Sequence, residues 1–284
     1  MDNQLQKDMW NGRAGASWVR HNSLLEGLLS EPGRQCMALF DLPASAQVLD
    51  VGCGCGNQTL DWASRLDPSC TVTGIDISQP MLALAEDLKS ANQSSLQANV
   101  SFLLGDASES LFPEASFDAI YSRFGVMFFA DPTAAFTQLR SSLKPNGQLG
   151  FVCWQSPALN PFFTAPMQAA ITVLPPPPPA KHGAPGPFGL SDRERTHSVL
   201  GVAGFTEVAV EPLKLELSAG TDRSFDDLFQ ELIQIGPAAA LIAESDSALG
   251  ERAKTAVYET LREFYSLGKG VRFEANFWLV SARK

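Results

Sequence analysis

Short apolar segments alternate with amphipathic segments through the middle of the chain. The apolar segments are typical of buried strands, and helical apolar spacing follows most of them. Strands that alternate with helices in this way predict an α/β fold, with a mostly parallel sheet and helices on both faces. The expected strands are 47–51, 70–75, 100–104, 117–121, 148–154, 205–217 and 271–282. The expected helices of this part are 59–66, 78–91, 132–143, 192–203 and a helical stretch over 225–267.

The alternation of strands and helices is less regular before the first expected strand and after the fifth. Residues 1 to about 30 look helical, and Pro32 and Gly33 are expected to end that helix before a second one from Gly33 to Leu42. After Trp154 the chain holds one helical piece at 162–174 and then five consecutive prolines at 175–179. We interpret the proline run as a surface connector rather than a motif for a partner, because such runs are common in linkers.

Composition narrows the class of protein. The chain has 284 residues, of which 45% are apolar and 18% charged, so a sizeable core is expected and wholesale disorder is not. The net charge of −10 argues against a nucleic-acid partner and against docking on an anionic membrane. We see no secretory signal and no segment long enough to span a membrane.

The cysteines point to a reducing compartment. Five of them form an odd, scattered set, which suits free thiols in a cytoplasmic protein better than a disulfide framework. Cys53 and Cys55 are separated by one residue and have no second pair nearby, so they make a weak zinc candidate. We therefore expect no metal.

A glycine-rich turn follows the first strand. Val48 to Val51 leads into Gly52-x-Gly54-x-Gly56, where glycines let the backbone turn sharply and approach a ligand. Asn57 stands where the dinucleotide fingerprint needs its third glycine. Asp50, just before the turn, would repel a pyrophosphate but would suit a ligand with an amino group. An NAD-dependent oxidoreductase is therefore disfavoured.

Two more acids end the next strands. Asp76 lies 20 residues beyond Gly56, where a carboxylate accepts hydrogen bonds from ribose hydroxyls, and Asp106 ends the third strand. For each acid alone, capping of a helix is the more common role. Three acids at the carboxyl ends of successive parallel strands instead indicate a ligand crevice.

Together these segments resemble the class I S-adenosylmethionine-dependent methyltransferases. The resemblance covers 47 to about 154, and the closest branch includes the ubiquinone and menaquinone methyltransferases. The tail at 273–280 is similar to the family's final antiparallel strand, whereas Asn146 stands in a turn where many members have glycine. The quoted segments are VLDVGCGCGN at 48–57, GIDIS at 74–78, LGDA at 104–107, FDAIYSR at 117–123 and LKPNGQL at 143–149.

The resemblance implies a Rossmann-like sheet of seven strands, helical cap insertions and S-adenosyl-L-methionine as cofactor. It implies that the turn cradles the methionine part, with Asp50 near the amino group. Asp76 would take the ribose hydroxyls with Ile77 on the adenine, and Asp106 would accept from the adenine amino group beside Ala107. The full set of cofactor residues implied is Asp50, Gly52, Gly54, Gly56, Asn57, Asp76, Ile77, Asp106, Ala107 and Ser122.

The resemblance also divides the chain. It implies N-terminal helices over the cofactor site at 1–46, a cofactor-binding core at 47–154 and a cap insertion with the proline-rich loop at 155–190. The core continues at 191–221, a helical cap follows at 222–268, and 269–284 form the final strand. We expect the two cap segments to cover the active site.

In-line methyl transfer needs alignment above all, and a base only when the nucleophile starts protonated. His21 is the candidate base, with a structural histidine as the alternative. Arg123 would pair with a carboxylate of cofactor or substrate, or else form a salt bridge within the protein. Trp18, Phe124, Met127 and Trp154 are expected to line the substrate pocket, although such aromatics are also common in plain core.

These features favour an enzyme of class EC 2.1.1 that methylates a small, apolar or aromatic molecule. The alternative is a regulatory protein that binds S-adenosylmethionine without transferring its methyl group. The sequence leaves open whether the acceptor atom is O, N, C or S, and whether the chain forms a homodimer.

Overall fold

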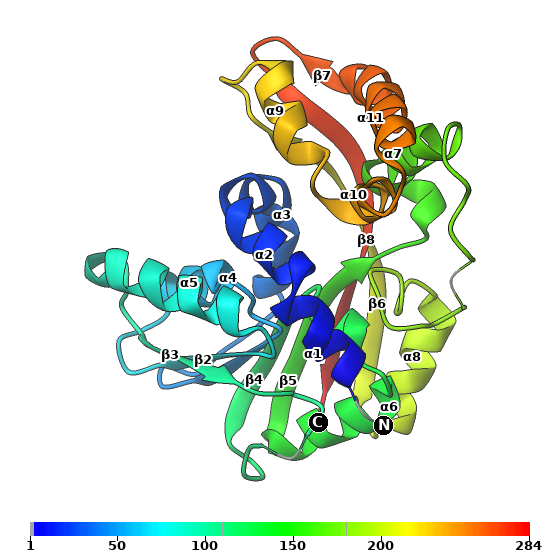
Figure 1. Cartoon of the computed structure of the whole chain (residues 1–284). Coiled ribbons are helices and arrows are strands. Elements are labelled where there is room, and N and C mark those ends of the chain that lie inside the picture. The colour runs from blue at the N-terminus through cyan, green and yellow to red at the C-terminus, as the bar shows by residue number, and fades with distance from the viewer. Residues whose placement is uncertain (1–2, 110, 180) are drawn as a thin grey trace.

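The computed structural model describes residues 3–109, 111–179 and 181–284. Its centre is one twisted sheet with helices on both faces, and a second lobe of helices stands above one edge of that sheet (Figure 1). Seven strands form the sheet in the order β3-β2-β1-β4-β5-β8-β6, and the short strand β7 pairs with β8.

The sheet is mostly parallel, as predicted. β1 pairs in parallel with β2 and β4, β3 with β2, and β5 with β4, whereas β8 runs antiparallel to both β5 and β6. The carboxyl ends of β1 to β5 therefore meet at one edge. The strands are β1 Gln47–Val51, β2 Thr71–Asp76, β3 Asn99–Leu104, β4 Phe117–Arg123, β5 Leu143–Trp154, β6 Thr206–Ala219, β7 Tyr265–Ser266 and β8 Gly270–Arg283.

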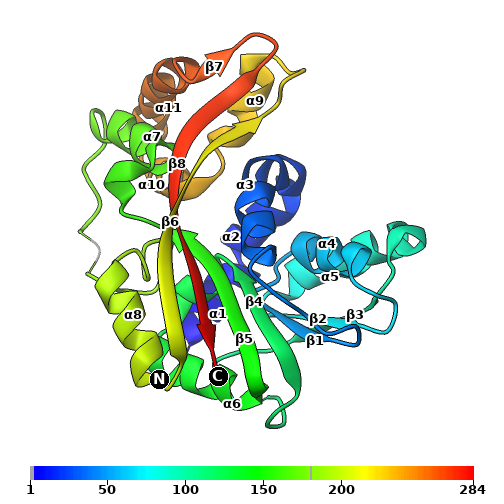
Figure 2. The ribbon, with the colours of Figure 1, turned by 180° about the vertical axis from the view of Figure 1, so that it is seen from behind.

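Helices cover both faces of the sheet (Figures 1 and 2). The helices α3 (Asn22–Met37), α4 (Asn57–Arg65) and α5 (Gln79–Ala91) pack on one face, and α6 (Pro132–Ser142) and α8 (Arg193–Val202) on the other. Three short 3-10 turns lie between these elements, at Gln93–Ser95, Val126–Phe128 and Pro157–Leu159.

The N-terminal region differs from the prediction. It folds as α1 (Gln4–Asn11), α2 (Arg13–Arg20) and α3, and Pro32 lies inside α3 instead of ending it. There is thus no separate helix over 33–42. A proline in a helix costs about 3 kcal/mol. One continuous apolar face offsets that cost by burying residues on both sides of the proline. This face consists of Leu24, Leu25, Leu28, Leu29, Pro32, Gly33, Cys36 and Met37.

The second lobe, which we call the cap, is built on the two long outer strands. β6 and β8 pair from Thr206 and Arg283 up to Ala219 and Val271, so they run from the core sheet into the cap (Figure 2). The cap helices are α7 (Pro161–Ile171), α9 (Phe225–Leu232), α10 (Gly236–Ala243) and α11 (Ser247–Arg262). The single helical stretch expected over 225–267 is therefore three helices and a short strand.

Asn146 and the proline run at 175–179 both have an irregular backbone, as their sequences predict. Asn146 adopts a φ of 63°, which asparagine tolerates, and makes an irregularity within β5. The prolines at 175–179 are exposed and lie in no regular element, as a connector should.

Candidate active site

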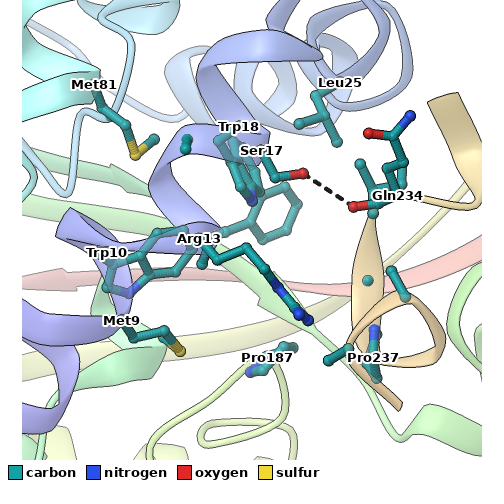
Figure 3. A pocket seen from close by; sticks show the side chains of 18 of the residues that line it. Met9, Trp10, Arg13, Ser17, Trp18, Leu25, Met81, Pro187, Gln234 and Pro237 are labelled. Atoms are coloured by element: carbon teal, nitrogen blue, oxygen red, sulfur yellow. Dashed lines mark hydrogen bonds between the residues drawn. The ribbon is translucent and has the colours of Figure 1, made fainter. Parts of the chain in front are cut away.

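A cavity of about 1550 Å³ lies at the carboxyl ends of the parallel strands. The core contributes the glycine-rich turn and the three strand-end acids to its floor. α1 and α2 form one wall, and α10 with the start of α11 forms the opposite wall (Figure 3). The cavity therefore lies between the core, the N-terminal helices and the cap.

The turn after β1 places its first two glycines in the left-handed region of backbone conformation. Gly52 has a φ of +69°, and a Cβ there would lie 2.6 Å from the Cα of Gly125. Gly54 has a φ of +56°, and its Cβ would meet the end of the Met81 side chain at 2.7 Å. Both glycines line the cavity, so a ligand can approach the backbone of the turn without a side chain in between. The amides of Gly52 and Cys53 already donate to the carbonyl of Ile75.

Asp50 is a buried carboxyl group in the cavity floor, only 1% exposed. Burial raises its pKa to about 7, although the Thr59 hydroxyl donates to it at 2.6 Å and Arg123 acts in the opposite direction to burial. A buried acid of this kind favours a cationic ligand group, which would restore the carboxylate form.

Asp76 ends β2 and holds the turn in place. One carboxylate oxygen accepts from the amide of Gly54 at 2.8 Å, and the other accepts from the amide of Ser78 at 2.8 Å. Burial raises the pKa of Asp76, and these backbone donors oppose the rise. A carboxylate offers about four lone-pair sites, so Asp76 can also accept from a ligand hydroxyl.

Asp106 lies at the opposite end of the floor, under α1. Its carboxylate accepts from Ser108 and from the side-chain amide of Asn3 at 2.8 Å. Burial opposes ionisation, but the hydrogen bonds from Ser108 and Asn3 prevail and lower the pKa of Asp106. The amide oxygens of Asn3 and Gln6 are buried in this wall without a partner among the described residues. Such orphaned acceptors suit an amino group of a ligand.

Hydrogen bonds attach α1 to the core beside this site. The Ser78 hydroxyl donates to the carbonyl of Trp10 at 2.6 Å, although Ser78 holds the predicted N-cap position of α5. The side chain of Asn11 donates to the carbonyl of Ile77 at 2.9 Å and accepts from the amide of Gln79 at 2.9 Å. The N-terminal helix is therefore part of the site.

Most of the predicted cofactor residues meet in this one cavity. Its wall includes Asp50, Gly52, Gly54, Asn57, Asp76, Ile77, Asp106 and Ala107. Two others do not reach it. Gly56 has a φ of +77°, and a Cβ there would lie 2.6 Å from the Phe102 ring, so this glycine allows helix and strand to pack closely. The buried Ser122 hydroxyl donates to the carbonyl of Val51 at 2.7 Å and accepts from two amides after β4, which occupies it within the protein.

Neither candidate catalytic residue presents an unpaired group to the cavity. His21 is 4% exposed and lies outside the cavity wall, with Nδ1 3.5 Å from a carboxylate oxygen of Glu231 on α9. This position suits the structural alternative. Arg123 does line the cavity, but it pairs with Glu26 at 2.9 Å and donates to the carbonyl of Leu29 at 3.0 Å. Of the two interpretations of Arg123, the structure shows the internal salt bridge.

The predicted pocket residues Trp18, Phe124, Met127 and Trp154 all line the cavity. Phe124 has a φ of 63°, rare for a bulky residue, and its ring stacks on Trp154 with centroids 5.1 Å apart. Sequence reasoning missed Trp10, which packs edge-on against Trp18 and Phe128. The presence of both tryptophans in the segment expected to cover the cofactor site was the available signal.

No helix in 3–109, 111–179 or 181–284 is long and apolar enough to cross a membrane. Within the same residues no three His, Cys, Asp or Glu side chains gather as a metal site would require.

Comparison with known proteins agrees with this geometry. Residues 48–147 match the family model described as a methyltransferase domain. Nocamycin O-methyltransferase of Saccharothrix syringae is 31% identical over 49% of this chain and 49% of its own length. Demethylmenaquinone methyltransferase of Lactiplantibacillus plantarum is 33% identical over 43% of this chain and 50% of its own. The chain thus spans about half the length of these curated relatives.

Solved structures share the fold. Phosphoethanolamine N-methyltransferase 2 of Haemonchus contortus, in complex with phosphomonomethylethanolamine and S-adenosylhomocysteine, gives a TM-score of 0.53 at 19% identity. That likeness covers 89% of this chain and 52% of the other. With the matched domain, the strand order and the glycine-rich turn between strand-end acids, residues 48–147 form a methyltransferase domain of the class I S-adenosylmethionine-dependent type.

Proposed function

We propose that the chain transfers the methyl group of S-adenosylmethionine to a small apolar or aromatic molecule. The observation that carries this proposal is the cavity itself. Three carboxyl groups and an open glycine turn form its floor, and aromatic side chains form much of the remaining wall. A sulfonium nucleoside and an apolar acceptor could therefore meet there away from water.

The chain's residues fit the cofactor. A Cβ at Gly52 would be blocked by Gly125, so the turn presents backbone without a side chain to the ligand. Asp50 would face the ligand's amino group, Asp76 the ribose hydroxyls, and Asp106 with the orphaned oxygens of Asn3 and Gln6 the adenine amino group. The bound cofactor supplies an electrophilic methyl group.

The protein's own contribution to transfer is alignment and exclusion of water. Phe124 and Trp154 present a stacked apolar wall beside the turn, and α1 and α2 cover the site from the other side. No side chain is assigned as base, since His21 lies outside the wall and Arg123 is paired.

Two measurements test the proposal. Titration calorimetry with S-adenosylhomocysteine should show one site, and labelled S-adenosylmethionine should pass its methyl group to a member of a panel of phenols, quinols, amines and thiols. The variant Asp76→Ala should lose most of the binding, whereas Asp222→Ala, an exposed residue outside the cavity, should keep it. Absence of binding by the wild type would refute the proposal. Binding without transfer to any acceptor would point instead to a non-catalytic S-adenosylmethionine-binding protein.

A further inference from the structure

The cavity is larger than one small ligand requires. Pockets for drug-sized molecules measure about 300–1,000 Å³, against about 1550 Å³ here. It runs from the strand-end acids past Phe124 and Trp154 to side chains of α10 and α11 such as Ile242. A space of this length, lined by Trp10, Trp18 and further aromatic side chains, suits an extended apolar acceptor next to the cofactor.

One cation points into this space. Arg13 begins α2, lines the cavity, and extends from beside Trp10 toward Pro187 and Pro237 (Figure 3). Among the hydrogen bonds and ion pairs of the described residues, none involves Arg13. A guanidinium group has five donors and always carries its charge, so it is available to an anion that enters the cavity.

The other cations of the wall are already engaged. Arg123 pairs with Glu26 at 2.9 Å, and Lys254 pairs with Glu251 at 2.6 Å. Arg20 donates to the side chain of Gln234 at 3.4 Å. Arg13 thus stands apart from the three other positively charged side chains of the wall.

The acids of the wall do not neutralise Arg13. Asp50, Asp76 and Asp106 lie in the floor, and Glu26 and Glu251 are paired. Glu244 has no ion pair among the described residues, but it directly follows α10, seven residues beyond Pro237 and about 10 Å from it along the helix axis. Arg13 is an exposed side chain at the cavity wall, and in a chain with a net charge of −10 an unpaired cation beside aromatic side chains is a specific feature.

We propose that the methyl acceptor is an extended apolar or aromatic acid, and that Arg13 binds its anionic oxygen group. This inference rests on the proposed function in so far as the cavity holds the acceptor. Arg13 can present two parallel N–H donors to a carboxylate or similar oxyanion, and such charge-assisted pairs are stronger than neutral hydrogen bonds. Arg13 acts as a specificity residue because it selects acids over neutral molecules of the same shape.

A matched pair of fluorescent probes tests the proposal. 1-Anilinonaphthalene-8-sulfonate and N-phenyl-1-naphthylamine share their aromatic body and differ by the sulfonate. With S-adenosylhomocysteine saturating, the anionic probe should bind at one site, and Arg13→Gln should weaken it about 10-fold or more. The neutral probe should bind Arg13→Gln and wild type alike. Arg252→Gln removes the same charge from an exposed residue outside the cavity and should change neither affinity.

Three results would overturn the proposal. The first is an equal loss of affinity for both probes in Arg13→Gln, and the second is an unchanged affinity of that variant for the anionic probe. The third is a loss of affinity for the anionic probe in Arg252→Gln as large as that in Arg13→Gln. Calorimetry with S-adenosylhomocysteine on the same samples separates this proposal from the function itself. If Arg13→Gln weakens S-adenosylhomocysteine instead of the probe, Arg13 serves the cofactor's carboxylate and the proposal on the acceptor fails. If wild type does not bind S-adenosylhomocysteine at all, the proposed function fails first.

Discussion

Asp50 is a carboxyl group kept from water at the end of β1. Burial raises its pKa from 3.8 to about 7, so near neutral pH the group is close to half protonated. A proton on Asp50 removes the charge that the proposed amino group of the ligand would meet. Burial of this one side chain therefore links ligand binding to protonation.

The same shift makes the stability of the free protein depend on pH. Because the folded-state pKa of about 7 exceeds the unfolded value of 3.8, the protonated carboxyl stabilises the fold fully at low pH, and this contribution is lost as the pH rises through 7. Asp50→Asn stays neutral at every pH. Between pH 5 and pH 8, the free energy of unfolding of wild type should therefore fall by about 2–3 kcal/mol more than that of Asp50→Asn.

Urea unfolding at several pH values measures this difference. Asp222→Asn, an exposed site outside the cavity, should keep the wild-type pH dependence. Wild type and Asp50→Asn curves that run parallel from pH 5 to pH 8 would show that burial does not perturb Asp50 in this way.

At the scale of elements, α2 and α9 join the two walls of the cavity. His21 lies 3.5 Å from Glu231, which also accepts from Arg223 at 2.5 Å. The Ser17 hydroxyl donates to the carbonyl of Gln234 at 3.0 Å, as Figure 3 shows. These contacts connect the N-terminal helices to the cap at the rim of the cavity, so they help to hold the cap over the core.

His21→Ala should loosen that connection. We expect backbone amides of α9 to exchange hydrogen faster and the free energy of unfolding to drop by about 1–3 kcal/mol, because a buried side chain is removed. Hydrogen exchange with mass spectrometry measures the first effect, and His197→Ala, an exposed histidine, is the control. With an acceptor in hand, a loss of about 10²–10⁴-fold in the transfer rate, together with an altered pH profile, would instead identify His21 as a base.

The elements also show what the sequence could predict. The core strands were predictable because each is a local apolar run, and the turn and three acids stand within a few residues of those strands. The continuation of α3 through Pro32 was not predictable from local pattern, because burial of the helix against the sheet decides it. The partners of His21 and Arg123 lie 210 and 97 positions away in the sequence, so the local sequence pattern could not identify them.

The cap and the core share their two longest strands. β6 and β8 pair continuously from Ala209 and Ser281 to Ala219 and Val271, across the boundary between the two lobes. The cavity draws its wall from the N-terminal helices, the core and the cap together. A ligand bound there contacts three parts of the chain at once, and unfolding of any one part would remove contacts from the site.

The molecule should therefore unfold in one cooperative transition, although it has two lobes. S-adenosylhomocysteine at about 100 times its Kd should add about 2.7 kcal/mol to the free energy of unfolding and shift that single transition upward as a whole. Scanning calorimetry with and without the ligand measures both effects. Two resolved transitions, of which only one moves with ligand, would mean that the cap folds independently of the core. In that case the pairing of β6 with β8 would not couple the folding of the two lobes. Contacts such as that of His21 with Glu231 would then be their sole connection.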